Sequence, residues 1–179
     1  DGTADDSKLP KYRIYKVRND VFPGGPVVDL SSEMKDERDT YDNIRERYET
    51  DWNMWPVEDG APFIDKNKNG IYEPEYDIPG VEHAKQTIWY VVNDLTEMPF
   101  NVSPTHRVLG IEMQVTIWAY DNQGVLSNML FRKHKLINKS QNEFKDMFVS
   151  MWSDPDVGWA PEDAAGTDST NNMVFAYNY

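Results

Sequence analysis

Apolar and polar residues alternate along several stretches of the chain, which is typical of half-buried β-strands. The longest such stretch runs from Arg107 to Asp121, and its odd-numbered positions from Leu109 to Ala119 are all apolar. Its even-numbered positions include Glu112, Gln114 and Thr116. Because successive side chains of a strand point to opposite faces, this stretch predicts a strand with one apolar and one mixed face.

Five other segments are rich in alternating, β-branched or aromatic residues and are also predicted to be strands. These segments are residues 11–20, 86–94, 125–139, 142–154 and 171–179. Short polar turns, such as the one from Asp121 to Gly124, are typical of connections between antiparallel neighbours. The pattern therefore predicts a mainly β fold, namely an antiparallel β-sandwich.

One amphipathic helix is predicted ahead of the β-rich part. Its apolar stripe consists of residues spaced by three and four positions, namely Tyr41, Ile44, Tyr48 and Trp52. Ser31 or Ser32 is the predicted N-cap, because a serine hydroxyl accepts a hydrogen bond from a backbone N–H of the first turn. The other faces are charged, so we expect the helix to lie on the surface of a larger body.

The chain is predicted to divide near residue 53. Residues 1–53 hold the first strand and the helix, and residues 54–179 form the β-sandwich module. The segment from Met54 to Gly80 is rich in proline and glycine and is predicted to be one long loop. Because the sequence ends within the strand-like run NMVFAYNY, we expect the chain to be a fragment of a longer protein.

The composition of the chain limits the kinds of partner and site that are expected. The chain has 179 residues, 31 acidic against 18 basic, and a net charge of −13. This charge repels phosphate, so nucleic acid is not an expected partner. Cysteine is absent, which excludes disulfides and thiolate metal sites. No run approaches the roughly 20 apolar residues of a membrane-spanning helix, so membrane insertion is not expected.

The loop contains a pattern of oxygen-bearing side chains that favours calcium. Asp65, Asn67 and Asn69 occupy alternate positions, and Gly70 follows at the point where EF-hand-like loops turn sharply. The backbone carbonyl of Ile71 takes the next ligand position. Calcium prefers six to eight such oxygens, so these residues are candidate ligands of Ca²⁺.

The second half of this loop departs from the EF-hand pattern. Tyr76 occupies the position of the usual bidentate glutamate, so its neighbours Glu75 and Asp77 are the candidates for the closing ligand, and Asp77 is favoured. Glu73 is a further candidate, binding directly or through water. The alternative is a hairpin or Asx-turn in which Asn67 and Asn69 satisfy backbone groups without any metal.

A second acidic cluster lies near the C-terminus. Its members are predicted to form a second metal site or a site for a hydroxyl-bearing ligand, and they are Asp154, Asp156, Asp163 and Asp168. The alternative is a solvated acidic loop. Trp152 and Trp159 lie in the same region and are candidates for stacking on a glycan, with core or rim packing as the alternative.

The sequence lacks a recognisable catalytic arrangement. The three histidines, His83, His106 and His134, lie in separate segments without the spacing of a zinc site. Neither a nucleophile elbow nor a phosphate-binding glycine loop is present. We therefore expect a protein that is not an enzyme.

The order of several sequence blocks resembles a region of large secreted or surface proteins of Bacteroidetes-type bacteria, many of which carry a type IX secretion sorting domain. The blocks are WPVEDGAPFIDKNKNGIYEPEYDIPG, QTIWYVVND, LFRKHKLINKS, MFVSMWSDPDVG and FAYNY. The resemblance implies an extracellular, calcium-stabilised β-rich module within a multidomain chain. The segment EDAAGTD departs from the expected acidic run, which weakens the case for the second metal site.

The expected function is therefore that of a calcium-stabilised structural or adhesion module, secreted or exposed at the cell surface. Its expected partners are neighbouring domains of the same longer chain, glycans, or further copies of itself. Two alternatives are a carbohydrate-binding module and a fragment of a secreted hydrolase whose paired carboxylates are completed by another domain.

Overall fold

The computed structural model describes residue 9 and residues 11–95, 108–121, 124–153 and 156–178. The chain forms two compact units, Asp1–Gln141 and Asn142–Tyr179, and each is treated by itself. The division expected near residue 53 falls inside the first unit, because a strand that precedes it pairs with a strand that follows it.

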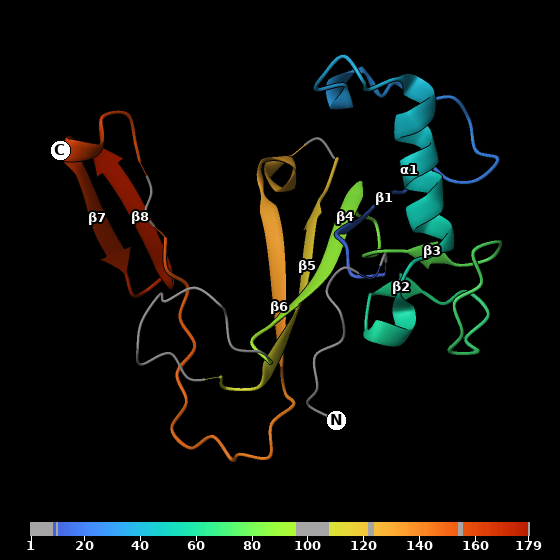
Figure 1. Cartoon of the computed structure of the whole chain (residues 1–179). Helices are drawn as coiled ribbons and strands as arrows, with labels where there is room; N and C mark the ends of the chain where they lie inside the picture. Colours follow the sequence, from blue (N-terminus) through green and yellow to red (C-terminus); the bar gives the residue numbers. More distant parts are fainter. Residues whose placement is uncertain (1–8, 10, 96–107, 122–123, 154–155, 179) are drawn as a thin grey trace. The chain divides into compact units, whose positions relative to one another are not determined.

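A four-stranded antiparallel sheet forms the centre of the first unit (Figure 1). Its strands are β1 (Tyr15–Arg18), β4 (Gln86–Asn93), β5 (Ile111–Ala119) and β6 (Leu130–Asn138), in the spatial order β1-β4-β5-β6. All four lie within segments predicted to be strands. The alternation of apolar and polar positions was therefore sufficient to locate them.

The register of the sheet decides which residues share a face. Trp89 of β4 lies opposite both Tyr15 of β1 and Thr116 of β5, and Thr116 lies opposite Lys133 of β6. Directly opposed residues point to the same side. We call this side of the sheet the tryptophan face, and the other side the opposite face.

The tryptophan face carries the core of the sheet. Five buried residues pack together there: Tyr15, Val17, Trp55, Ala61 and Trp89. Two of them come from the segment Met54–Gly80, so this segment covers the sheet with its own apolar side chains. The ring of Tyr15 meets that of Trp55 edge-on at 6.3 Å, an arrangement that aromatic pairs favour.

The segment predicted to be one long loop contains short regular elements. Residues Val57–Asp59 form a 3₁₀ turn, η2, and β2 (Phe63–Ile64) pairs with β3 (Ile78–Pro79) as a two-stranded ribbon. The prediction of a continuous loop is therefore wrong at these positions. Residues 65–77 connect the two ribbon strands and contain the candidate calcium ligands.

Within the described residues there is one α-helix, α1, which runs from Tyr41 to Asn53 and packs beside β1 (Figure 1). Its predicted apolar stripe is confirmed, since Ile44, Tyr48 and Trp52 are buried. Ile44 and Tyr48 form a second core cluster with Val21 and Leu30.

The predicted start of the helix is wrong. Thr40 is the N-cap, and its hydroxyl accepts from Asn43 N while the Asn43 side chain accepts from Thr40 N, which completes a capping box. Ser31 lies instead in a separate 3₁₀ turn, η1 (Ser31–Glu33), where Asp29 accepts its N–H. A third 3₁₀ turn, η3 (Val125–Asn128), precedes β6.

The second unit contains an antiparallel pair, β7 (Asp163–Asp168) and β8 (Met173–Asn178), preceded by a 3₁₀ turn, η4 (Ala160–Glu162). The strand β8 was predicted, and β7 was not. The strand predicted for residues 142–154 is wrong over its described part, 142–153, which has no regular structure. The described chain thus consists mainly of antiparallel strands with one α-helix, which confirms the predicted mainly β fold class.

Candidate functional site

The loop from Asp65 to Asp77 turns at two residues with left-handed backbone conformation. Lys68 has φ +60° and Gly70 has φ +78°. The Asp65 carboxylate accepts hydrogen bonds from Asn69 N (3.2 Å) and Gly70 N (2.7 Å). The first aspartate therefore folds the backbone around itself, a geometry suited to a ligand-bearing turn.

The two asparagines of the loop converge on Glu73. Their amide nitrogens both donate to Glu73 Oε2, at 2.5 Å from Asn67 and 2.8 Å from Asn69. Their amide oxygens accept from backbone N–H groups, of Asn69 and of Ile71 respectively. The structure thus brings four of the predicted ligand residues into one hydrogen-bonded cluster, and the Asx-turn alternative describes this cluster equally well.

Asp77 has a different place from the other candidate ligands. It is only 2% exposed, and its two carboxylate oxygens accept from Lys66 N (3.0 Å) and Glu73 N (2.9 Å). One buried side chain therefore ties the beginning of the loop to its end. The role of Asp77 as a calcium ligand stays a prediction.

The loop is also attached to the helix. Trp52 Nε1 donates to the carbonyl of Pro74 at 3.1 Å, and the Tyr72 hydroxyl donates to the carbonyl of Trp52 at 2.7 Å. Burial raises the pKa of the Tyr72 phenol, and the nearby carboxylates of Asp77 and Glu75 raise it further. Protein contacts alone therefore hold this end of the loop against α1.

The cluster fits a hard cation incompletely. Among the described residues, no three His, Cys, Asp or Glu side chains are grouped closely enough to hold a metal ion. The loop offers carboxylates from Asp65 and Glu73, amide oxygens from Asn67 and Asn69, and the carbonyl of Ile71. Coordination by both amide oxygens requires half a turn of each carboxamide, since their nitrogens now face Glu73.

The second acidic cluster is not gathered into one place. Asp154 lies outside the described residues, and Asp156 is exposed. Asp163 and Asp168 occupy opposite ends of β7, roughly 16 Å apart at the usual rise of a strand. Asp168 accepts from Thr170 N and from both nitrogens of Asn171, so it closes the turn to β8.

Trp152 and Trp159, the candidate stacking residues, are both exposed. Their exposed fractions are 84% and 68%. Trp152 lies in the irregular segment before η4, and the carbonyl of Trp159 accepts from Glu162 N at 3.0 Å. Their role in glycan stacking stays a prediction.

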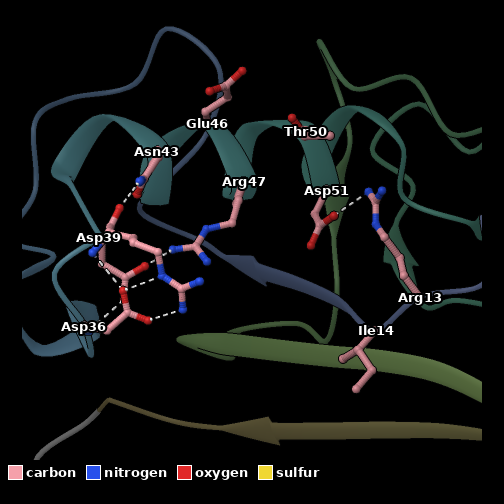
Figure 2. A pocket seen from close by; sticks show the side chains of 10 residues that line it. Arg13, Ile14, Asp36, Asp39, Asn43, Glu46, Arg47, Thr50 and Asp51 are labelled. Atoms are coloured by element: carbon pink, nitrogen blue, oxygen red, sulfur yellow. Dashed lines mark hydrogen bonds and ion pairs between the residues drawn. The ribbon is translucent and has the colours of Figure 1, made fainter. Parts of the chain in front are cut away.

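A groove of about 790 Å³ lies along α1 and was not predicted from the sequence (Figure 2). Six of its seven charged residues pair with one another: Arg38 with Asp36 (2.8 Å), Arg47 with Asp39 (2.8 Å) and Arg13 with Asp51 (2.5 Å). The seventh, Glu46, forms no ion pair with another described residue. Most of the charge in the groove is therefore neutralised within the protein.

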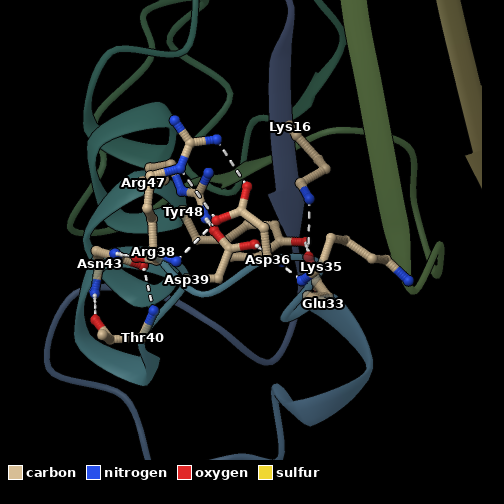
Figure 3. Close-up of polar contacts among 10 residues, drawn as sticks. All are labelled: Lys16, Glu33, Lys35, Asp36, Arg38, Asp39, Thr40, Asn43, Arg47 and Tyr48. Atoms are coloured by element: carbon tan, nitrogen blue, oxygen red, sulfur yellow. Dashed lines mark hydrogen bonds and ion pairs between the residues drawn. The ribbon is translucent and has the colours of Figure 1, made fainter.

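Glu33 is the centre of a polar network between η1, β1 and α1 (Figure 3). Its carboxylate accepts from Lys16 Nζ (2.8 Å), Arg18 Nη1 (2.7 Å) and the Tyr48 hydroxyl (2.5 Å). Burial raises the Glu33 pKa, but these hydrogen bonds outweigh it and leave the pKa lowered. The network fixes η1 against the sheet, and it is a structural feature.

Asp20 extends the same network. Its carboxylate accepts from the Arg18 guanidinium and from Lys85 Nζ, the latter at 2.7 Å. Burial raises the Asp20 pKa, but the hydrogen bonds from Arg18 and Lys85 dominate and lower it to about 2. The carboxylate therefore stays ionised at any pH well above that value.

The chain has no recognisable match among known proteins: neither the protein families, nor the curated proteins, nor the solved structures gave one. The resemblance to secreted proteins of Bacteroidetes-type bacteria therefore stays an expectation.

Proposed function

We propose that the chain is a non-enzymatic, calcium-stabilised structural or adhesion module of a secreted or surface protein. The observation that carries the proposal is the convergence of Asp65, Asn67, Asn69 and Glu73 around the left-handed turn at Gly70. A cation placed between these side chains would replace the two amide donors that now satisfy Glu73. Calcium suits such a site because it accepts many oxygens in flexible geometry.

The overall charge supports a cation as ligand. The chain carries a net charge of −13, and an acidic surface raises the local concentration of divalent cations. Extracellular modules bind calcium with dissociation constants of order 10⁻⁴–10⁻³ M. A site with two carboxylates and few further ligands is suited to that weak range, which also supports a location outside the cell.

The proposed architecture is a small β-sandwich. The ribbon β2–β3 and the four-stranded sheet would be its two layers, with Phe63 packed against the core of the tryptophan face. Calcium would then act at the connection between the two ribbon strands. By stiffening residues 65–77, it would stabilise the layer that covers the sheet.

The edges of the sheet support a role in assembly. The strand β6 is an edge strand, and it exposes Leu130 (67%) and Leu136 (40%). Unpaired edge strands are sites for pairing with another chain. Neighbouring domains of a longer chain or further copies of this one are therefore the proposed partners.

Calcium is expected to raise the thermal stability of the chain. For a dissociation constant of about 10⁻⁴ M, 10 mM Ca²⁺ adds about 2.7 kcal/mol by mass action. This corresponds to an increase in Tm of roughly 5–10 °C for a domain of this size. Differential scanning calorimetry in 10 mM CaCl₂ and in EGTA measures the difference.

The variant that tests the site is Asp65→Asn, which keeps one oxygen but removes a charge from the first ligand position, and Asp163→Asn is its matched control. This variant is expected to lose most of the calcium-dependent increase in Tm, whatever its own stability. Asp163→Asn, outside the loop, should keep the full increase. An equal Tm in calcium and EGTA for the unaltered chain would contradict the proposal.

A further inference from the structure

A second cavity, of about 490 Å³, lies between the ribbon segment and the tryptophan face of the sheet. Residues 60–64 and 80–82 form one wall, and strands β4, β5 and β6 form the other. Cavities of this size are in the usual range for small-molecule sites. Unlike the groove along α1, this cavity has a lining whose polar atoms are not satisfied by one another.

Three buried polar atoms among the lining residues have no hydrogen-bond partner in the described structure. They are Trp89 Nε1, Trp118 Nε1 and Gln114 Oε1. Trp89 is 3% exposed and Gln114 is 7% exposed, so bulk water does not compensate them. Buried polar atoms are almost always paired in native proteins. Two acceptors and one donor from an occupant would satisfy these three atoms.

The other buried indoles of this unit show the usual arrangement. Trp52 Nε1 donates to Pro74 O at 3.1 Å, and Trp55 Nε1 donates to Pro62 O at 2.7 Å. The unpaired state is therefore particular to the two tryptophans that line the cavity. It points to a ligand at that place.

The orientation of the Gln114 side chain is fixed by its neighbours. Its amide nitrogen donates to Asp59 O at 2.7 Å and to Glu112 Oε1 at 3.2 Å, which leaves the amide oxygen unpaired. Gly60 approaches this oxygen so closely that a Cβ there would lie 2.5 Å from it. A glycine with φ +105° thus makes room at the wall of the cavity.

Two lysines of β6 give the cavity a positive side. Lys133 lies opposite Thr116 and Lys135 opposite Gln114, so both belong to the tryptophan face. No ion pair links either lysine to another described residue. The Glu82 carboxylate at the rim lies 3.6 Å from His83 Nε2, which is charged only when protonated. In a chain of net charge −13, two adjacent unpaired lysines favour an anionic group on the ligand.

We propose that this cavity binds a sugar acid, a small molecule that carries several hydroxyls and one carboxylate. Ring or hydroxyl oxygens accept from the two indole N–H groups, and a hydroxyl donates to Gln114 Oε1. The carboxylate binds Lys133 and Lys135. This site is separate from the calcium loop, so the inference does not depend on the proposed calcium binding.

The test follows the indole N–H signals of the whole ¹⁵N-labelled chain while D-glucuronate is added. The Trp89 and Trp118 signals are expected to move and saturate, with a dissociation constant on the order of 1 mM or below. The Trp52 and Trp55 signals should stay in place, because their hydrogen bonds are internal. D-glucose, which lacks the carboxylate, is expected to bind at least about tenfold more weakly.

Variants of β6 distinguish binding in the cavity from a general effect of positive charge on the ligand. The double variant Lys133→Gln, Lys135→Gln is expected to weaken glucuronate binding about tenfold or more. Arg132→Gln removes the same kind of charge from the opposite face and should change binding less than about twofold. Trp118→Phe keeps an aromatic ring but removes one donor, and it should weaken binding while the Trp89 signal still reports it.

Three results would overturn the proposal. The first is the absence of any saturable movement of the Trp89 and Trp118 signals, which would mean that the cavity holds ordered water only. The second is equal affinity for glucuronate and glucose. The third is an equal loss of binding in Arg132→Gln and in the double lysine variant.

Discussion

Replacing Asp77 by alanine is expected to lower the free energy of unfolding by about 3 kcal/mol. The buried carboxylate accepts Lys66 N and Glu73 N, and an alanine leaves both N–H groups without an acceptor. Asp77 itself is only 2% exposed, so water cannot readily take the place of its carboxylate, and losing two hydrogen bonds there costs more than losing an ordinary surface contact. Urea unfolding followed by tryptophan fluorescence measures the change.

This experiment is carried out in EGTA, so that any calcium-dependent stability is removed from the comparison. The control is Glu75→Ala, which removes an exposed acid from the same loop and should stay within about 0.5 kcal/mol. A loss for Asp77→Ala no greater than for Glu75→Ala would show that Asp77 does not hold the loop ends together.

Glu33→Ala is the second substitution with a large expected effect, a loss of roughly 2–3 kcal/mol in the free energy of unfolding. The change removes the acceptor that Lys16 and Tyr48 share (Figure 3) and that also binds Arg18. Arg18 keeps Asp20 as a partner, so the loss stays below that of an isolated buried charge. Urea unfolding again gives the measurement.

Glu37→Ala is the matched control, since Glu37 is exposed in the same segment. A double-mutant cycle with Tyr48→Phe then isolates the hydrogen bond between the two side chains. We expect the sum of the two single losses in unfolding free energy to exceed the loss of the double variant. Strict additivity of the two losses would contradict a direct contact between Glu33 and Tyr48.

The helix and the central strands could be predicted because their signals are local and periodic. Ile44, Tyr48 and Trp52 recur at helical spacing, and β5 alternates at strand spacing over nine residues. The helix start was missed because serines and threonine are comparable caps in sequence. Asn43 completes the capping box only with Thr40, three residues before it.

The strand β7 could not be predicted from propensity. Its sequence, DAAGTD, contains alanine, glycine and aspartate, which are depleted in strands. Pairing with β8 outweighs this preference, since its backbone groups then form a complete antiparallel ladder. The opposite error occurred at residues 142–153, where alternating apolar residues suggested a strand but no pairing partner is found in the described chain.

The two candidate sites also differ in how far they could be predicted from the sequence. The ligand residues of the loop lie within thirteen positions, from Asp65 to Asp77, so their spacing could be recognised in the sequence. The cavity combines Gly60, Trp89, Gln114 and Lys133, which come from separate segments. Only the register of β4, β5 and β6 places Trp89, Gln114 and Lys133 on one face, and Gly60 joins them from the segment that covers the sheet.

Isothermal titration of the chain with CaCl₂ tests the central claim most directly. We expect one site with a dissociation constant of order 10⁻⁴–10⁻³ M, a much weaker response to MgCl₂, and much weaker calcium binding by Asp65→Asn. Saturable binding that persists unchanged in Asp65→Asn would place the ion elsewhere. No heat of binding at millimolar Ca²⁺ in the unaltered chain would contradict the account.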